Sequence, residues 1–249
     1  MTQVATHPVT QPKAEAIERG AVVKTVSLSK SIDGRAILRD LNIEIAAGGY
    51  VAILGGNGAG KSTLLRILST LVPPSSGRIE LFGDTATAAS VDLRKRIGLI
   101  GHQVMLYRDL SARENLEFFA KLYGMKDPIA RASRMLEMSG LSARAADPVR
   151  NFSRGMLQRV AIARALVHDP ELLLADEPFT GLDAPSIASL EHLLAHLNDA
   201  GKTIVLVNHD IEQSLRLAER AIVLRGGRVA VDQSTTRLYA REVLSEVLS

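Results

Sequence analysis

The sequence contains no cysteine and no tryptophan, and aromatic residues make up only 4% of it. Without cysteine the chain has no disulfide bond, zinc–thiolate site or thiol nucleophile, which fits a reducing compartment. Long apolar runs are also missing: the longest, at 50–54, has five residues, whereas a transmembrane helix needs about 20. Residues 1–20 lack the apolar segment of a secretory signal. We therefore expect a cytoplasmic protein, soluble or peripheral, with a flexible tail at residues 1–20.

Charge of one sign is not in excess either. The 30 Lys and Arg residues nearly balance the 27 Asp and Glu residues, and they form no dense basic block. This balance argues against a dedicated nucleic-acid binder, so we expect no nucleic-acid partner. What the chain does have is length and apolar content: 249 residues, 46% of them hydrophobic, suffice for one large domain, with or without a subdomain.

Short apolar runs bounded by charged residues or glycine alternate with helical patterns along most of the chain. Runs of about four apolar residues fit strands that are buried on both faces, as in a parallel sheet. The alternation of such strands with helices predicts an α/β fold. The predicted strands are 22–28, 41–45, 50–54, 97–100, 172–175, 204–207 and 221–224, and the predicted helices are 61–69, 186–198 and 211–218.

The middle of the chain, from Ser111 to about Leu166, shows helical patterns and almost no strand signal. Ser111 followed by Glu114 forms a capping box, which marks the start of a helix. In that helix four apolar side chains share one face. The face is either part of the core or a docking surface for a partner, and its residues are Leu116, Phe119, Ala120 and Tyr123.

A glycine-rich turn lies between a predicted strand and a predicted helix. Residues 55–62, Gly-Gly-Asn-Gly-Ala-Gly-Lys-Ser, match the phosphate-binding pattern G-x-x-x-x-G-K-[ST] at every fixed position. Glycine lets backbone N–H groups curl around phosphate oxygens without a Cβ clash. Lys61 is then expected to reach the β- and γ-phosphates, and the hydroxyl of Ser62 to bind Mg²⁺. A glycine-rich turn without a ligand is the alternative.

Two acidic residues stand side by side where another predicted strand ends. Four apolar residues lead directly into Asp176 and Glu177. Adjacent carboxylates repel each other and are costly to desolvate unless a cation or a proton lies nearby. A division of labour resolves this: Asp176 holds Mg²⁺, directly or through water, and Glu177 polarises an attacking water. An ordinary acidic strand end is the alternative interpretation.

Two further polar residues lie at the end of a predicted strand and at the start of a predicted helix. Strand 204–207 is followed by His209, and the carboxyl ends of strands in a doubly wound sheet share one crevice. We therefore expect His209 near the phosphates and Glu177, although a lone histidine is more often structural. Ser153 precedes a predicted helix over 154–166; serine is a favoured N-cap, and a helix N-terminus favours an anion. The residues alone do not identify that anion.

Together these motifs resemble the nucleotide-binding subunits of ABC transporters over residues 22–231. The resemblance is carried by the glycine-rich loop, Gln103, the segments 172–178 and 180–183, and His209. Residues 152–156, Phe-Ser-Arg-Gly-Met, align with the family signature Leu-Ser-Gly-Gly-Gln. The resemblance implies a P-loop NTPase (RecA-like) α/β core at 21–232, an inserted α-helical subdomain at about 104–166, and a C-terminal helix at 233–249.

The resemblance also implies a mechanism with ATP as substrate and Mg²⁺ as cofactor. Two ATPase subunits pack head to tail as a homodimer on an integral membrane permease, and the signature of one faces the γ-phosphate on the other. Glu177, His209 and Lys61 would be catalytic, and Asp183 would lie across the dimer. The metal would be held by Ser62, Gln103 and Asp176, of which Gln103 also couples to the permease. ATP would contact Gly55, Gly56, Asn57, Gly58, Ala59, Gly60, Lys61, Ser62, Thr63 and Ile32, and the signature in trans would be Ser153, Arg154, Gly155 and Met156.

The sequence departs from the family pattern at three of these positions. Arg154 and Met156 replace the Gly and Gln of the signature. Arg154 either adds charge to the phosphate or lies in solvent, and we favour solvent. Ile32 falls where the family has an aromatic that stacks on adenine. Apolar contact survives there without π-stacking, so base selectivity is expected to relax.

Within the family, two patterns resemble the ATPase of the haem exporter of cytochrome c maturation: the triplet 101–103, Gly-His-Gln, and the Arg-Gly-Met signature. They imply haem export for cytochrome c biogenesis, at the inner face of the cell membrane. Exporters of drugs, polysaccharides or ions are the alternative. A soluble ABC-type ATPase acting on ribosomes or DNA is disfavoured, because no heptad run separates Gln103 from Ser153. A P-loop kinase is disfavoured by the placement of Asp176, Glu177 and His209.

Overall fold

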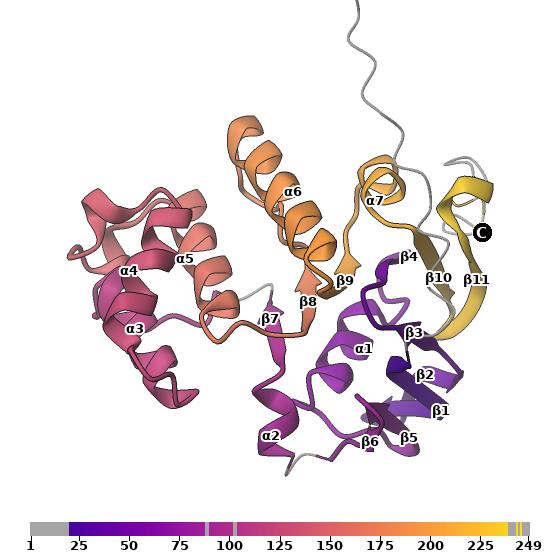
Figure 1. The fold of residues 1–249 in the computed structure, drawn as a ribbon. Helices are drawn as coiled ribbons and strands as arrows, with labels where there is room; N and C mark the ends of the chain where they lie inside the picture. Colours follow the sequence, from indigo (N-terminus) through magenta and orange to yellow (C-terminus); the bar gives the residue numbers. More distant parts are fainter. Residues whose placement is uncertain (1–19, 88–89, 102–103, 239–242, 244, 246–249) are drawn as a thin grey trace, which may run out of the picture.

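The structure is a computed structural model, which describes residues 20–87, 90–101, 104–238, 243 and 245. Two sheets form the fold, and helices cover both faces of the larger one (Figure 1). The larger sheet has the strand order β11-β10-β4-β9-β8-β7, in which only β11 runs antiparallel to its neighbour. Its strands are β4 (Tyr50–Gly55), β7 (Ile97–Ile100), β8 (Leu172–Asp176), β9 (Thr203–Val207), β10 (Arg220–Arg225) and β11 (Arg228–Ser234).

The five parallel strands confirm the α/β prediction, and each of them matches its predicted range to within one residue at either end. Their uniform apolar character has a simple cause. In β4, Ala52 and Leu54 belong to one hydrophobic core, whereas Val51 and Ile53 belong to a second core on the opposite face. Because successive side chains of a strand point to opposite faces, a strand covered on both faces needs apolar residues throughout.

The smaller sheet is antiparallel, and the sequence did not predict it as a sheet. Its strands are β1 (Ala21–Ile32), β2 (Arg35–Leu41), β3 (Glu44–Ala46), β5 (Ser76–Leu81) and β6 (Asp84–Thr85). The single strand predicted at 41–45 was wrong, because the chain divides there into β2 and β3. Thr25 of β1 bridges the division: its Oγ1 donates to the carbonyl of Leu41 at 2.9 Å and accepts from the amide of Ile43 at 2.8 Å. Helix α1 (Lys61–Leu68) packs in the core that this sheet shares with the larger one.

Helices fill the segment between β7 and β8, where the described residues form no named strand. They are α3 (Ala112–Leu122), α4 (Pro128–Met138), α5 (Arg154–Leu166) and two 3₁₀ turns (Ser142–Arg144 and Val149–Asn151); the short α2 (Val91–Arg94) precedes β7. The predicted capping box is confirmed, since Ser111 Oγ accepts from the amide of Glu114 and Glu114 Oε2 accepts from the amide of Ser111. The predicted apolar face of α3 packs into the core, and the subdomain limits of 104–166 stay a prediction.

Two helices of the larger sheet follow β8 and β9. Helix α6 (Ala184–Asp199) begins two residues earlier than predicted, because Asp183 caps it and Pro185 fits its first turn. Helix α7 (Ile211–Leu217) begins at the predicted residue. A C-terminal helix was predicted at 233–249, and its predicted start is wrong, because β11 continues to Ser234 and a 3₁₀ turn (Thr235–Arg237) follows. The tail at 1–19 and residues 239–242, 244 and 246–249 lie outside the described residues.

The helices that the structure describes include none with the length and apolar character needed to cross a membrane.

A stacked pair of rings joins the helical segment to the larger sheet. The rings of Tyr123, after α3, and His168, after α5, are 3.8 Å apart with 13° between their planes. Nε2 of His168 lies 3.0 Å from the carbonyl oxygen of Ile97, so this nitrogen carries the proton. Nδ1 is buried with no hydrogen-bond partner among the described residues. Burial lowers the pKa of His168 from 6.5 to about 4.

This low pKa predicts an acid-sensitive stability. Between the folded pKa of about 4 and the ordinary value of 6.5, the unfolded chain binds more protons, so the free energy of unfolding falls as the pH drops through this range. His168→Phe keeps a ring for Tyr123 and removes the titration. From pH 7 to pH 5, measured by urea unfolding, wild type should lose about 2 kcal/mol more than the variant.

Replacement of the exposed His196 by Phe is the matched control, and it should follow wild type. Equal losses in wild type and His168→Phe would contradict the assignment of the buried neutral ring.

Candidate functional site

The glycine-rich loop joins β4 to α1, and two of its glycines are required by packing. Gly55 has φ 146° and Gly60 has φ 102°. A Cβ atom on Gly55 would lie 2.3 Å from the carbonyl oxygen of Leu224, and one on Gly60 would lie 2.4 Å from Leu38 Cδ2. At Gly58 a Cβ would meet nothing within 4 Å. Glycine is favoured there by its backbone conformation, with φ 78°, and not by packing.

Lys61 is the first residue of α1, and its ammonium lies inside the loop. Nζ donates to the carbonyl oxygens of Gly55 at 2.8 Å and Gly56 at 2.9 Å. Desolvation lowers the pKa of Lys61, while the negative charges of Glu177 and Asp176 oppose that shift. The lysine is therefore held by main-chain carbonyls that phosphate oxygens can replace.

The hydroxyl and the carboxylate predicted to hold Mg²⁺ lie side by side. Ser62 Oγ donates to Oδ1 of Asp176 at 3.2 Å, across 114 residues of chain. Oxygen ligands of this kind suit Mg²⁺, which binds through one or two carboxylates and the phosphates of its substrate. Gln103, the third predicted ligand, lies outside the described residues, and the metal set stays a prediction.

Glu177 and His209 contact each other, as the sequence predicts. Oε1 of Glu177 lies 2.6 Å from Nε2 of His209. Glu177 has φ 53°, an unfavourable value for a non-glycine residue. Its amide donates to the carbonyl of Val207 at 2.8 Å, which extends the pairing of β8 and β9 past the end of β8. Thr180 Oγ1 lies 3.5 Å from Oε2 of Glu177, so the carboxylate is approached from two sides.

The predicted start of α5 is confirmed, since Ser153 Oγ accepts from the amide of Met156 at 3.3 Å. Arg154 is exposed, as expected, but its stem is not free in solvent. Its Nε and Cδ lie 2.6 Å and 2.7 Å from the place where a Cβ of Gly181 would stand. Arg154 and Glu177 also line one cavity of about 60 Å³. The signature thus contacts the 180–183 loop of its own chain, which sequence reasoning missed.

The remaining predicted residues occupy consistent places, and their roles stay predictions. Asp183 caps α6: its Oδ1 accepts from the amide of Ser186 at 3.1 Å, and hydrogen bonds from Ser186 lower the pKa of Asp183. Ile32 ends β1 and is exposed, on the hairpin whose second strand, β2, approaches Gly60. The half-buried Thr63 lies in the first turn of α1, and Gly155 lies where a Cβ would be 3.7 Å from the carbonyl of Gly181.

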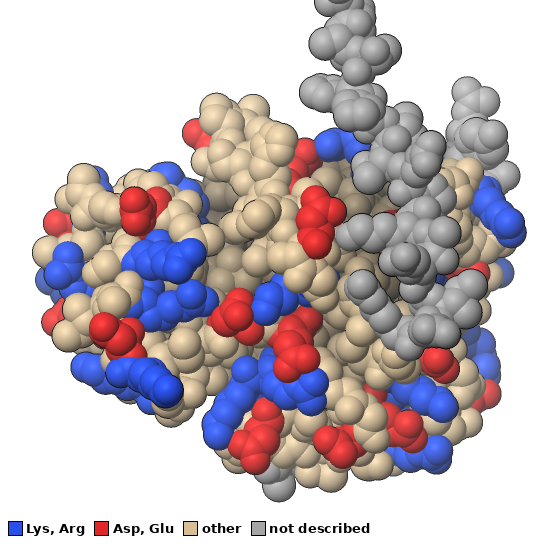
Figure 2. Space-filling view, viewed as in Figure 1, with Lys and Arg blue, Asp and Glu red and all other residues tan. Residues whose placement is uncertain are grey.

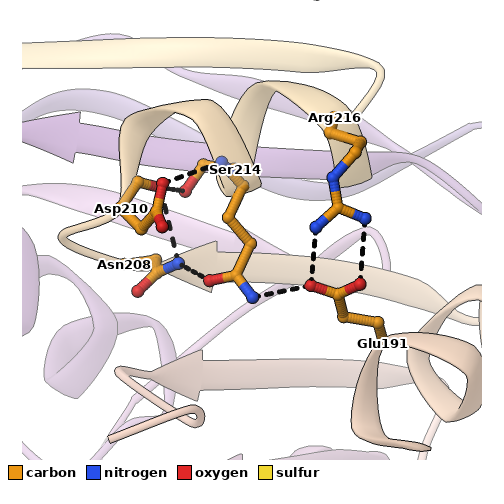
Figure 3. Close-up of polar contacts among 6 residues, drawn as sticks. Glu191, Asn208, Asp210, Ser214 and Arg216 are labelled. Atoms are coloured by element: carbon orange, nitrogen blue, oxygen red, sulfur yellow. Dashed lines mark hydrogen bonds and ion pairs between the residues drawn. The ribbon is translucent and has the colours of Figure 1, made fainter. Parts of the chain in front are cut away.

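Sequence reasoning also missed a polar network next to His209, and Figure 3 shows its members Asn208, Glu191 and Arg216. The amide of His209 donates to Asn208 Oδ1 at 2.9 Å, and Asn208 Nδ2 donates to Gln213 Oε1 at 2.7 Å. Gln213 Nε2 donates to Glu191 Oε1 at 2.7 Å, and Arg216 holds both oxygens of Glu191 at 2.8 Å and 2.9 Å. Glu191 and Arg216 lie 25 residues apart on different helices, so the sequence carries no local signal of the pair.

Comparison with known proteins gives a consistent picture. Residues 38–180 match the family model described as ABC transporter. The ABC transporter ATP-binding protein NatA of Bacillus subtilis is 38% identical over 82% of this chain and 85% of its own length. Daunorubicin resistance ATP-binding protein DrrA3 of Streptomyces coeruleorubidus is 38% identical, over 85% of this chain and 66% of its own. Nod factor export ATP-binding protein I of Cupriavidus metallidurans is 34% identical, over 92% and 76%.

Among solved structures, a dimeric ATP-binding cassette in a post-hydrolysis state, bound to ADP and Pi, superposes with a TM-score of 0.80. It is 32% identical and covers 87% of this chain and 100% of its own.

The geometry at Glu177 predicts a clean separation of binding from turnover. Glu177→Gln keeps the shape of the side chain and removes the carboxylate that is predicted to act as the base, so we expect ATP affinity to persist and turnover to fall about 10²–10⁴-fold. Steady-state hydrolysis and nucleotide binding by the purified variant measure the two effects, and the variant should accumulate as an ATP-bound dimer. Glu44→Gln, an exposed substitution on β3, is the control. Hydrolysis near the wild-type rate would remove Glu177 from its assigned role.

Proposed function

Since the chain belongs to the ABC transporter family, as an ATP-binding subunit that hydrolyses ATP with Mg²⁺, we propose that it energises an exporter. The cargo class that we favour is that of drugs, polysaccharides or ions, because relatives at 34–38% identity are named for daunorubicin resistance and Nod factor export. Haem export takes second place: it rests on two short patterns, and none of the relatives compared above is named for it. The site of action would be the cytoplasmic face of the membrane, on a permease subunit.

The observation that carries the proposal is the convergence of Lys61, Glu177 and His209 at one end of the larger sheet. Lys61 would leave the carbonyls of Gly55 and Gly56 for the phosphates, and the loop amides would cradle them. Glu177 would polarise the attacking water, and His209, 2.6 Å away, would orient that carboxylate. Mg²⁺, when bound by Ser62 and Asp176, supplies positive charge to the phosphates.

The two halves of the predicted ATP site stand on different parts of one chain. The glycine-rich loop leads into α1, which contacts β2, β4 and β8. The signature begins α5, which contacts α3, α4 and β7. We infer that a complete site needs the loop of one subunit and the signature of a second, packed head to tail. A homodimer then holds two sites.

This shared site predicts complementation between inactive variants. Lys61→Ala removes the phosphate-binding cation, and Ser153→Arg removes the signature hydroxyl and crowds the helix start. Either homodimer lacks every complete site, whereas a mixed dimer has one. An equal mixture should therefore recover about one quarter of wild-type ATPase activity if subunits pair at random.

Ser153→Thr keeps a hydroxyl cap and serves as the control for the fold of α5. If mixed dimers demonstrably form and no activity returns, both halves of the site belong to one chain.

An exposed apolar cluster, the docking patch, lies on the helical segment and on the chain that leads into it. It consists of Met105, Tyr107, Phe118 and Leu122, which are 40–65% exposed. The rings of Tyr107 and Phe118 meet edge to face at 5.0 Å. Exposed apolar clusters of this kind mark protein or membrane contacts. Leu106, in contrast, packs against the core.

The charge around the docking patch indicates the kind of partner. Residues 104–166 contain 11 Lys and Arg against 6 Asp and Glu, a net charge of +5 in a chain whose total is +3. Figure 2 shows blue Lys and Arg side chains gathered over this helical part of the molecule. We therefore infer that the patch binds a short permease helix with an apolar face and acidic flanks.

Arg164 provides a physical link from this patch toward the nucleotide site. It is buried on α5, and its Nη2 donates to the carbonyl of Leu99 at 2.5 Å. Its Nη1 lies 3.7 Å from the sulfur of Met105, and its guanidinium stands 5.3 Å from the ring of Phe119. One side chain of the signature helix thus contacts the chain on both sides of Gln103.

The docking patch predicts a selective loss of membrane association. Tyr107→Asp places an acidic group in the patch and should reduce co-purification with membranes that contain the neighbouring gene products. Nucleotide affinity should stay unchanged, because the patch lies on the helical segment and the phosphate loop on the sheet core. Leu71→Asp is the matched control, since Leu71 is 51% exposed and Tyr107 53%.

Loss of both properties would indicate misfolding of the variant. Full retention of co-purification would exclude this patch as the docking surface. A wild-type chain that never associates with such membranes would favour a non-transport ABC ATPase.

A further inference from the structure

In the polar network next to His209, the direction of each hydrogen bond is fixed by an ion pair at the far end, between Glu191 and Arg216. The two terminal nitrogens of the Arg216 guanidinium, Nη1 and Nη2, donate to the carboxylate of Glu191, and these bonds lower the pKa of Glu191. The ionised carboxylate only accepts hydrogen bonds. Gln213 must therefore turn its NH₂ group toward Glu191, which leaves its oxygen facing Asn208.

The same reasoning applies one step further along the network. Because Gln213 presents an oxygen, Asn208 must turn its own NH₂ group toward it, at 2.7 Å. Oδ1 of Asn208 is then left to accept from the backbone amide of His209, at 2.9 Å. Asn208 also lies at the buried end of β9, so it has little room to rotate. The carbonyl of Asp210, 3.4 Å from Nδ2 of Asn208, favours the same orientation. The charge on α6 and this carbonyl together set how the Asn208 amide meets the backbone amide of His209.

Helix α7 does not need this network in order to form. Asp210 caps it by accepting from the amide of Gln213 at 2.9 Å, and Ser214 Oγ donates to the carbonyl of Asp210 at 2.6 Å. The side chain of Gln213 takes part in neither bond. The side chain of Gln213 is therefore not needed for α7 to form, but it connects Glu191 to Asn208.

We propose that Gln213 is a positioning residue for His209, oriented by the Glu191–Arg216 ion pair and acting through Asn208. The inference rests on the role assigned to His209 in the proposed function. It assigns to α6 and α7 the task of fixing where the imidazole meets Glu177. Without Gln213, Nδ2 of Asn208 keeps only its 3.4 Å bond to the carbonyl of Asp210. The Asn208 amide is then held less firmly against the amide of His209, and the 2.6 Å contact between His209 and Glu177 loosens.

The first test is the effect of Gln213→Leu on kcat and on ATP affinity. Leucine keeps the volume and removes both hydrogen bonds. We expect kcat to fall about 10-fold, because a small misplacement of a catalytic group is costly, and ATP affinity to stay within about twofold. Glu212→Gln, on the exposed side of the same helix, should leave both unchanged. Unchanged kcat in Gln213→Leu, with an active wild type, would overturn the inference.

The second test asks whether Gln213 acts through His209. In a His209→Ala background, measured by single-turnover hydrolysis, Gln213→Leu should have no further effect. A purely structural role would lower activity by the same factor in both backgrounds, and that outcome would overturn the inference.

The third test exchanges the two partners of one bond. Gln213→Glu alone sets two carboxylates against each other and should lower kcat at least as far as Gln213→Leu. In the double variant Gln213→Glu/Glu191→Gln, the amide at position 191 donates to the carboxylate at position 213, and kcat should largely recover. Absence of recovery in a folded double variant counts against the relay. If the wild-type chain itself has no ATPase activity, the proposed function is overturned instead, and His209→Ala cannot lower the rate of hydrolysis further.

Discussion

Burial of the parallel strands on both faces is the constraint on which the site depends. A strand covered on both sides has no room for polar side chains along its length, so chemistry is confined to its ends. The neighbouring order β4-β9-β8 brings three such ends together. Lys61, His209 and Glu177 follow these ends in the chain, and this is why residues more than a hundred positions apart lie at one end of the sheet.

The position of Glu177 shows how the sheet holds a strained residue in place. Its φ of 53° is unfavourable for a side chain with a Cβ. The amide of Glu177 nevertheless pairs with Val207, as though β8 continued for one more residue. That bond fixes the backbone at the point where it turns, and the carboxylate is carried to His209. Strain of this kind persists only where surrounding contacts over-determine it.

The sequence predicts those parts of the fold and site whose signals are local. Uniform apolar runs located the parallel strands, and the spacing of Ser111 and Glu114 located α3. The antiparallel sheet was predicted only in part: the strand predicted at 22–28 lies within β1, whereas β5 and β6, which are largely exposed, were missed. In β1, only one hydrogen-bonding side chain, Thr25, marks where the partner strand divides. The contact of Arg154 with Gly181 depends on tertiary packing, and so no local pattern could predict it.

Among the described residues, the two hydrophobic cores lie on opposite faces of the larger sheet, whose strands contribute side chains to both. Lys61 begins α1, which packs in the core shared with the smaller sheet, whereas the signature begins α5, which packs in the core of α3, α5 and α6. Motion of one core relative to the other must therefore be borne by the chain segments at the strand ends, since the packed interiors deform little. Arg164 stands at such a place, where it contacts Leu99 at the end of β7 and Met105 beyond Gln103. Arg164 thus joins the end of a sheet strand to the segment that leads into the helical core.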